Sequence, residues 1–308
     1  MTRQLRSLAI GDHDLYASPY LHRVAQAMGR LGHIHSTVNI RQPVDVIARR
    51  VLDVRPDILW THMFLWAPPG SPRVEQLVSV ATDAARRGAK VVIHDGDYKE
   101  QTRHPADISG WASVALCNHT FSRAAWRVPQ LRWPYFAFAQ DQIATPDPSL
   151  ACDLFFAGTI GAGPVYATRS AFLRAVQSRG VGLRLPSPAD GNTLFRTASY
   201  AASATCVLGF GRPGVKGWVD TRVFQYPGAG AILLHDDAAG YLEPGVHYVP
   251  YRSGDAESVA DAVARVKAMP AAEQRAMRER AFAYVQERHS SVARVVEVLR
   301  FLGLASPA

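Results

Sequence analysis

The residues best suited to bind an anion lie in one stretch of the chain, from Gly209 to Gln225. Its first part alternates glycine with basic residues, at Gly209, Gly211, Arg212, Gly214, Lys216 and Gly217. The N–H groups of a glycine loop and the positive end of a following helix both attract phosphate. Asp220 or Thr221 can cap that helix, and Arg222 then falls in its first turn, where a bound phosphate would explain a cation. The stretch therefore predicts a phosphate site, with a solvated arginine on an exposed turn as the alternative.

Two short polar motifs could supply a general base. Residues 11–14 (Gly-Asp-His-Asp) follow the first predicted strand, and residues 94–97 (His-Asp-Gly-Asp) follow the fourth. Parallel α/β sheets bind their ligands at the carboxyl ends of their strands, which is where both motifs fall. The candidates for deprotonating a hydroxyl are therefore His13, Asp95 and Asp97. Weaker candidates are His62, after the third strand, and His119.

The same two motifs contain Asp-x-Asp triplets, which can hold a divalent cation on a diphosphate. Triplets of this kind arise by chance at this aspartate content, and both lie in the other half of the chain from the phosphate stretch. We therefore expect chemistry without a metal or cofactor, in which basic side chains and helix ends offset the charge of a leaving group.

Length and composition indicate the frame that must position these residues. A chain of 308 residues with 48% hydrophobic residues suits two globular domains. No run of eighteen apolar residues and no signal peptide is readable, so we expect no membrane span. The three cysteines, Cys117, Cys152 and Cys206, are far apart, which favours reduced thiols in a cytoplasm over disulfides or a zinc site.

The net charge of +8 raises the question of a nucleic-acid partner. Residues 1–150 and 151–308 each carry 17 basic and 13 acidic residues, so each half has a charge of +4. No basic run stands out, and a small anionic ligand would need only a few of these charges.

Short apolar runs alternate with amphipathic stretches, which predicts an α/β fold with parallel strands covered by helices. In the first half the expected strands are 7–10, 34–38, 58–61, 90–94 and 114–117, and the expected helices are 20–31, 44–54, 74–87 and 121–127. A proline-rich stretch from Leu131 to Pro148 is expected to link two domains.

The pattern then starts again. In the second half the expected strands are 154–157, 182–185, 205–208, 231–234 and 248–251, with a helix over 166–178. From Ala256 onward the chain is expected to be helical, with breaks near Pro270 and near His289 and Ser290. We therefore expect two doubly wound domains, 1–148 and 149–308.

Several features of the second half occur together in one known family. They are Arg222-x-Phe224-Gln225, a glycine turn, an apolar strand ending in His235-Asp236-Asp237, and the segments 241–245 (Tyr-Leu-Glu-Pro-Gly) and 246–251 (Val-His-Tyr-Val-Pro-Tyr). Earlier, residues 154–159 (Leu-Phe-Phe-Ala-Gly-Thr) are followed by Arg169 on a predicted helix. Over roughly residues 90 to 300 the chain thus resembles GT-B glycosyltransferases, and among them the spore-maturation-protein-like group.

The resemblance implies two Rossmann-like domains that face a central cleft. The C-terminal domain would hold a nucleotide-diphosphate sugar and the N-terminal domain a hydroxyl-bearing acceptor. The terminal helix would pack back onto the N-terminal domain. The chain would then be a glycosyltransferase that moves the sugar to the acceptor hydroxyl.

Site residues follow from the resemblance position by position. Thr221 and Arg222 would face the donor diphosphate, with Arg212 or Lys216 as a second cation. Gln225 stands where relatives commonly hold the donor ribose with a glutamate, and it brings one hydrogen bond but no charge. Gly158 and Thr159 would let a substrate approach the backbone closely. Gly217 replaces a second glutamate of many retaining relatives.

Three other functions remain open at this level. A modified base in DNA could be the acceptor, since the positive charge would bind the phosphate backbone. The chain could instead be a nucleotide-sugar-binding module without turnover, an alternative that the loss of an acid at Gln225 keeps open. Gly209-x-Gly211-x-x-Gly214 also fits the dinucleotide fingerprint, but its place late in the second half makes a dehydrogenase the weakest of the three.

Overall fold

The chain folds into two compact units, each built around its own parallel sheet. The computed structural model describes residues 3–11, 19–62, 72–95, 108–117, 128–132, 144–158, 160, 164–186, 194–211, 222–236, 238 and 240–305. Unit 1 comprises Met1–Phe136 and Ser291–Ala308, and unit 2 comprises Ala137–Ser290. The chain thus returns from unit 2 to unit 1 after Ser290. Within the described residues, no helix is both long enough and apolar enough to span a membrane.

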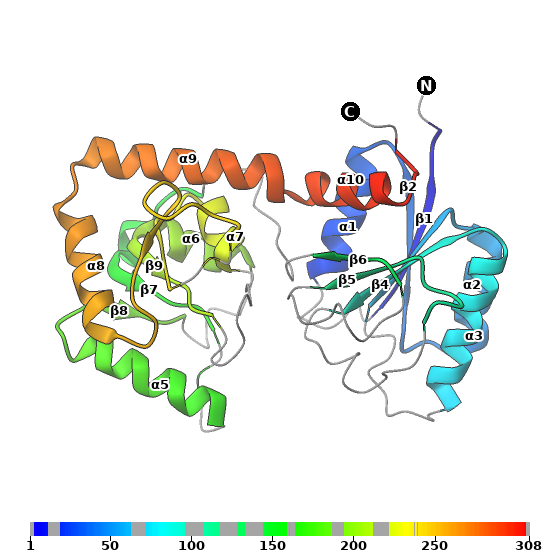
Figure 1. The fold of residues 1–308 in the computed structure, drawn as a ribbon, viewed down its shortest axis with the longest axis horizontal. Coiled ribbons are helices and arrows are strands. Elements are labelled where there is room, and N and C mark those ends of the chain that lie inside the picture. Colours follow the sequence, from blue (N-terminus) through cyan, green and yellow to red (C-terminus); the bar gives the residue numbers. More distant parts are fainter. Residues whose placement is uncertain are drawn as a thin grey trace. The chain divides into compact units, whose positions relative to one another are not determined.

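The sheet of unit 1 has the strand order β2-β1-β3-β4-β5-β6, with all neighbours parallel. Its strands are β1 (Arg6–Gly11), β2 (Ile34–Asn39), β3 (Ile58–His62), β4 (Lys90–Asp95), β5 (Val114–Cys117) and β6 (Gln130–Arg132). The helices that pack around it are α1 (Pro19–Arg30), α2 (Val44–Val54), α3 (Pro72–Arg86) and the terminal α10 (Ser291–Phe301), which lies against α1 (Figure 1).

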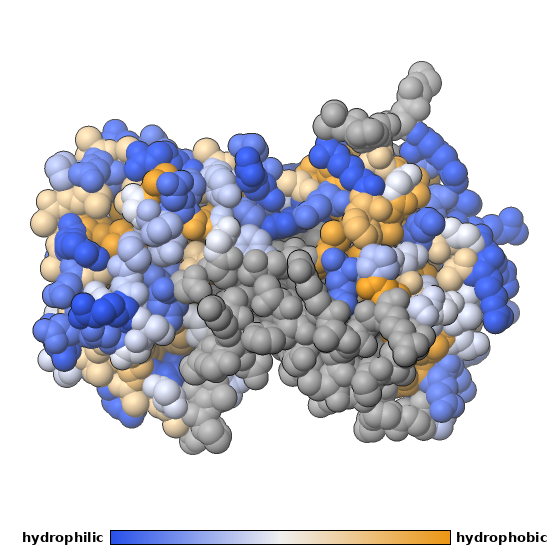
Figure 2. Space-filling view, in the orientation of Figure 1, coloured by the Kyte–Doolittle hydropathy of each residue, from blue (hydrophilic) through white to orange (hydrophobic). Residues whose placement is uncertain are grey.

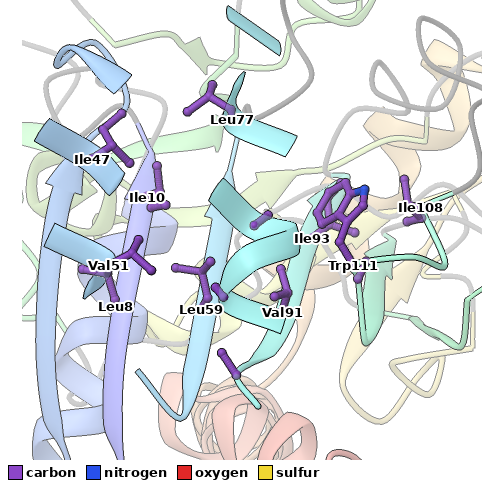
Figure 3. Close-up of a cluster of buried hydrophobic side chains, with 14 of the residues drawn as sticks. Leu8, Ile10, Ile47, Val51, Leu59, Leu77, Val91, Ile93, Ile108 and Trp111 are labelled. Carbon is purple, nitrogen blue, oxygen red and sulfur yellow. The ribbon is translucent and has the colours of Figure 1, made fainter. Parts of the chain in front are cut away.

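The core of unit 1 follows from the two-residue period of its strands. Leu8 and Ile10 project to the same face of β1 and pack against Ile47 and Val51 on α2 (Figure 3). Leu77 on α3 joins the same fully buried cluster. Because every strand of this sheet is parallel, its carboxyl ends meet at one edge.

Five strands expected in the first half are present, and the α/β class is confirmed. One expectation is wrong in part: β6 occupies the start of the stretch that was expected to be linker from Leu131 onward. An edge strand of three residues is compatible with nearby prolines because its outer N–H groups need no ladder partner. The expected helix over 121–127 lies outside the described residues.

The sheet of unit 2 has the order β11-β10-β9-β7-β8 and is also parallel throughout. Its strands are β7 (Cys152–Phe155), β8 (Leu183–Arg184), β9 (Ala204–Leu208), β10 (Leu233–His235) and β11 (Tyr248–Pro250). A short 3₁₀ turn, Pro148–Leu150, precedes β7.

Within the part of unit 2 that the structure describes there are five helices, and they pack on both faces of its sheet (Figure 1). They are α5 (Pro164–Gln177), α6 (Leu194–Ser203), α7 (Arg222–Gly228), α8 (Ala256–Ala268) and α9 (Ala271–His289). Phe155 on β7 packs with α6 and α7, whereas its neighbours Leu154 and Phe156 pack with α5 and α8. The sheet is therefore buried on both faces, as parallel sheets are.

The expected breaks in the C-terminal helical region are confirmed at Pro270 and Ser290. Asp255 caps α8 by accepting the N–H groups of Glu257 and Ser258, and Pro270 separates α8 from α9. On the face drawn in Figure 2, the described surface of each unit is a mixture of hydrophilic and hydrophobic residues. Among the described residues, the largest fully buried side chains include Trp60 in unit 1 and Phe155, Phe156 and Phe224 in unit 2, whereas Phe301 is exposed.

Candidate anion-binding site

Four neighbouring strands of unit 2 end at one edge of its sheet. Each is followed by residues that could face a ligand there. β7 leads into Ala157 and Gly158, β9 into Gly209–Gly211, β10 into Asp236, and β11 into Tyr251. This is the edge at which α/β sheets bind ligands.

Arg222 is the first residue of α7 and points toward the exit of β7. Its Nη1 donates to the carbonyl oxygen of Ala157 at 2.7 Å, and its Cζ lies 5.2 Å from the centroid of the Phe156 ring. One turn later on α7, the hydroxyl of Tyr226 accepts the N–H of Ala157 at 3.0 Å. Two contacts from α7 thus fix the backbone that leads into Gly158.

Gly158 is packed too closely for any side chain. A Cβ there would lie 2.7 Å from Nη1 of Arg222 and 2.6 Å from Cζ of Phe156, and Phe156 is fully buried. Real Cβ atoms do not approach other atoms at these distances, so only glycine allows the backbone to pass beside the guanidinium. The expectation that this position brings backbone close to a ligand remains a prediction.

A second guanidinium converges on the same ring. Arg169 on α5 has its Cζ 5.8 Å from the centroid of Phe156, 5.2 Å from that of Phe210 and 5.7 Å from that of Tyr166. Phe156 and Phe210 stack with their centroids 5.1 Å apart. Ring faces stabilise cations placed over them, so this cluster concentrates positive charge at the edge of the sheet.

No local sequence pattern indicates the contribution of Arg169. Its ring partners Phe156 and Phe210 follow two different strands, β7 and β9, and no local motif joins them to α5. The only sequence signal was the family resemblance, which places an arginine on this helix without giving it a role. We add Arg169 to the candidate site.

The remaining donor-side predictions divide into two groups. Gln225 is half-buried on α7, three residues from Arg222 and hence on the same side of the helix. The others, Thr159, Arg212, Lys216 and Thr221, lie outside the described residues, and their assignments remain predictions.

The corresponding edge of unit 1 carries histidines. His62 ends β3 and His94 lies beside it on β4, with ring centroids 5.2 Å apart. Both side chains are buried, with 3% and 1% exposed. Burial, and secondarily the neighbouring His62, hold the pKa of His94 well below its usual value. His94 is therefore neutral at pH 7.

Most of the predicted catalytic residues of unit 1 fall outside the part of the chain that the structure describes. Asp95 is the last residue of β4, which places its backbone at the carboxyl edge as expected. His13, Asp97 and the weaker candidate His119 lie outside the described residues. Among the residues that are described, no group of three His, Cys, Asp or Glu side chains is arranged to hold a metal ion.

Part of the chain matches a known protein family, and the whole chain is similar in fold to solved structures. Residues 169–300 match a family model described as glycosyl transferase-like. The sequence matches no curated protein.

Solved structures similar to the whole chain include UDP-forming trehalose-phosphate synthases. The enzyme from Burkholderia xenovorans has a TM-score of 0.56 at 12% identity, with 100% of both chains covered. The Escherichia coli protein bound with UDP-2-fluoro glucose has a TM-score of 0.57 at 10% identity, with 98% of this chain and 100% of that chain covered. At these identities the likeness shows the fold, which is GT-B. The chain thus has the GT-B fold, and its residues 169–300 match a glycosyl transferase-like family, which together support a glycosyltransferase.

Proposed function

We propose that the chain transfers a sugar from a nucleotide-diphosphate sugar to an acceptor hydroxyl, with the donor diphosphate bound at the carboxyl edge of the unit 2 sheet. The observation that carries this proposal is the convergence of Arg169 and Arg222 on Phe156, where the backbone of Gly158 passes close beside the Arg222 guanidinium. A diphosphate bound there would bring two guanidinium groups and a dianion together, which favours charge-assisted hydrogen bonds.

The same arrangement would accelerate the reaction. Negative charge develops on the diphosphate as the bond to the sugar breaks, and fixed cations lower the barrier most where that charge appears. Arg222 is held in place by Ala157 and Phe156, and little reorganisation is needed when the charge develops. We propose that the reaction runs without a metal ion.

Three finer assignments complete the proposal. Gln225 would accept a hydrogen bond from a ribose hydroxyl, since it lies on the same side of α7 as Arg222. Thr221, together with Arg212 or Lys216, would add contacts to the diphosphate. Unit 1 would bind the acceptor, with Asp97, His13 or Asp95 as its base. The motif around Arg222 and Phe224 supports placing the chain in the spore-maturation-protein-like group.

The donor nucleotide is best sought first among uridine nucleotides. The printed names of two structural neighbours mention UDP, as a product in one and as part of a bound fluorosugar in the other. Neither comparison supports DNA as the acceptor or a binding role without turnover.

The test is an assay for release of nucleoside diphosphate from a panel of UDP-, GDP-, ADP- and dTDP-sugars. We expect turnover with one nucleotide class, and a loss of about 100-fold in kcat/KM in Arg222→Ala, the effect typical of removing a group that stabilises transition-state charge. Arg174→Ala removes the same charge from an exposed position on α5 and should leave activity unchanged. Equal activity in wild type and Arg222→Ala would remove Arg222 from the site.

A further inference from the structure

Asp236 joins the loops that follow three neighbouring strands of unit 2. It follows β10 directly, and its Oδ1 accepts the backbone N–H of Gly211 at 2.9 Å. Its Oδ2 accepts the hydroxyl of Ser253, which lies beyond β11, at 2.8 Å. Nδ1 of the fully buried His235 lies 3.3 Å from Oδ1, and the carboxylate itself is only 10% exposed. One side chain therefore ties the exits of β9 and β11 to that of β10.

The first residue of the same turn is fixed from two further sides. The carbonyl oxygen of Gly209 accepts a hydrogen bond from the hydroxyl of Tyr251 at 2.9 Å. The N–H of Gly209 donates to the carbonyl oxygen of Leu234, also at 2.9 Å. A Cβ on Gly209 would lie 2.6 Å from Cδ2 of His235. The turn from Gly209 to Gly211 is thus held at both of its ends, by Leu234 of β10 and by Asp236 and Tyr251, which directly follow β10 and β11.

The negative charge of Asp236 favours a role in holding the turn over a direct contact with the ligand. A carboxylate beside a site for a diphosphate repels that ligand, so its presence there calls for a compensating reason. The bonds from Gly211 and Ser253 supply one, because a carboxylate accepts hydrogen bonds more strongly than a neutral oxygen. An asparagine could accept from Gly211 and bond Ser253 without the charge, which separates a geometric role from an electrostatic one.

We propose that Asp236 is a positioning residue that sets the conformation of the Gly209–Gly211 turn for diphosphate binding. The proposal rests on the function proposed above, since it requires that this edge of the sheet receive the donor. Phe210, the middle residue of the turn, lies against Arg169, so the position of the turn also sets that of a site cation. Loss of the tie should therefore weaken nucleotide binding without unfolding the unit.

The experiment measures the dissociation constant of UDP, GDP and ADP by calorimetry for wild type, and then that of the best binder for three variants. Asp236→Ala loses two hydrogen bonds and should weaken binding about tenfold, whereas Ser253→Ala loses one and should weaken it about threefold. Asp236→Asn keeps the geometry and should bind within about threefold of wild type. Thermal unfolding of each variant checks that it is folded at the assay temperature.

The outcomes separate the two proposals. If wild type binds none of the three diphosphates, the proposed function fails and this inference fails with it. If wild type binds and Asp236→Ala binds equally well, only the positioning role is overturned. Binding by Asp236→Asn as weak as that of Asp236→Ala would also overturn it, since the charge and not the geometry would then matter. If Asp236→Ala does not fold, unchanged binding by Ser253→Ala overturns the role.

Discussion

The two sheets of this chain share parallel topology but end in different chemistry. The carboxyl edge of the unit 1 sheet carries His62 and His94, whose rings are buried side by side. The corresponding edge of unit 2 carries Arg169, Arg222 and the glycine at position 158. The same frame thus presents uncharged imidazole at pH 7 in one unit, at least at His94, and concentrated positive charge in the other.

This difference decides which unit suits an anion. Guanidinium stays protonated at any pH a protein tolerates and presents several N–H donors, whereas a buried neutral histidine offers one donor at most. The edge of unit 2 is therefore the better match for a diphosphate, in line with the proposed donor site. The edge of unit 1 suits a neutral hydroxyl acceptor, in line with the proposed division of labour.

The largest effect expected in unit 2 beyond that of Arg222 comes from Gly158→Ala. The added Cβ would displace Arg222 or the buried ring of Phe156, and we expect a loss of about 30-fold in kcat/KM because small displacements of catalytic groups are costly. Steady-state kinetics with the best donor measures it.

Gly29→Ala, on α1, is the control for that change. A Cβ at the exposed Gly29 would have no atom within 4 Å outside the backbone of its own helix. We expect activity within about twofold of wild type, since surface substitutions without a clash change little. Equal losses in the two variants would show that glycine at position 158 has no special role.

A smaller effect is expected from Arg169→Ala. Arg169 reaches the cluster from α5 and contacts Phe210, so its loss should raise the dissociation constant of the nucleoside diphosphate about tenfold, as for a charged hydrogen bond. Arg174→Ala changes the same charge on the same helix at an exposed position. Calorimetry on both variants would contradict the assignment if they lost affinity equally.

The smallest effect concerns the stability of unit 1 in acid. The folded pKa of His94 is lowered, so below about pH 6.5 the unfolded chain binds a proton there that the folded chain does not. The contribution of neutral His94 to the free energy of unfolding is therefore complete above pH 6.5. Below that pH it falls by about 1.4 kcal/mol per pH unit, until the pH reaches the folded pKa.

His94→Gln should reduce that slope. Urea unfolding between pH 7.5 and 5.5, followed by tryptophan fluorescence, would report on the buried Trp60 and Trp111 of this unit. His22→Gln, a change at an exposed position on α1, serves as the control. An unaltered slope in His94→Gln would show that another group causes the acid sensitivity.

The fold could be predicted from the sequence wherever a local pattern carries it. Apolar runs marked the long central strands, and Pro270 marked a helix boundary. The sequence does not predict α6, whose residues 194–203 are rich in Ser, Thr and Ala, because packing of Tyr200 and Ala201 against the core stabilises it. The three-residue strand β6 was likewise hidden among prolines.

The candidate site shows the same limit. Arg222 could be identified because it lies beside a glycine-rich stretch and within a family motif. The resemblance included Arg169 and Asp236 but gave neither a role, because their partners follow strands distant in sequence, such as Phe210 for Arg169 and Gly211 for Asp236. Residues that act through such long-range contacts leave no local pattern.

The most direct test of this account is a crystal structure of the protein with the nucleoside diphosphate that binds best. We expect the phosphates beside Gly158, within hydrogen-bond distance of Arg222 and close to Arg169. Phosphates bound at the His62 and His94 edge of unit 1, or away from both sheets, would contradict the assignment of the donor to unit 2.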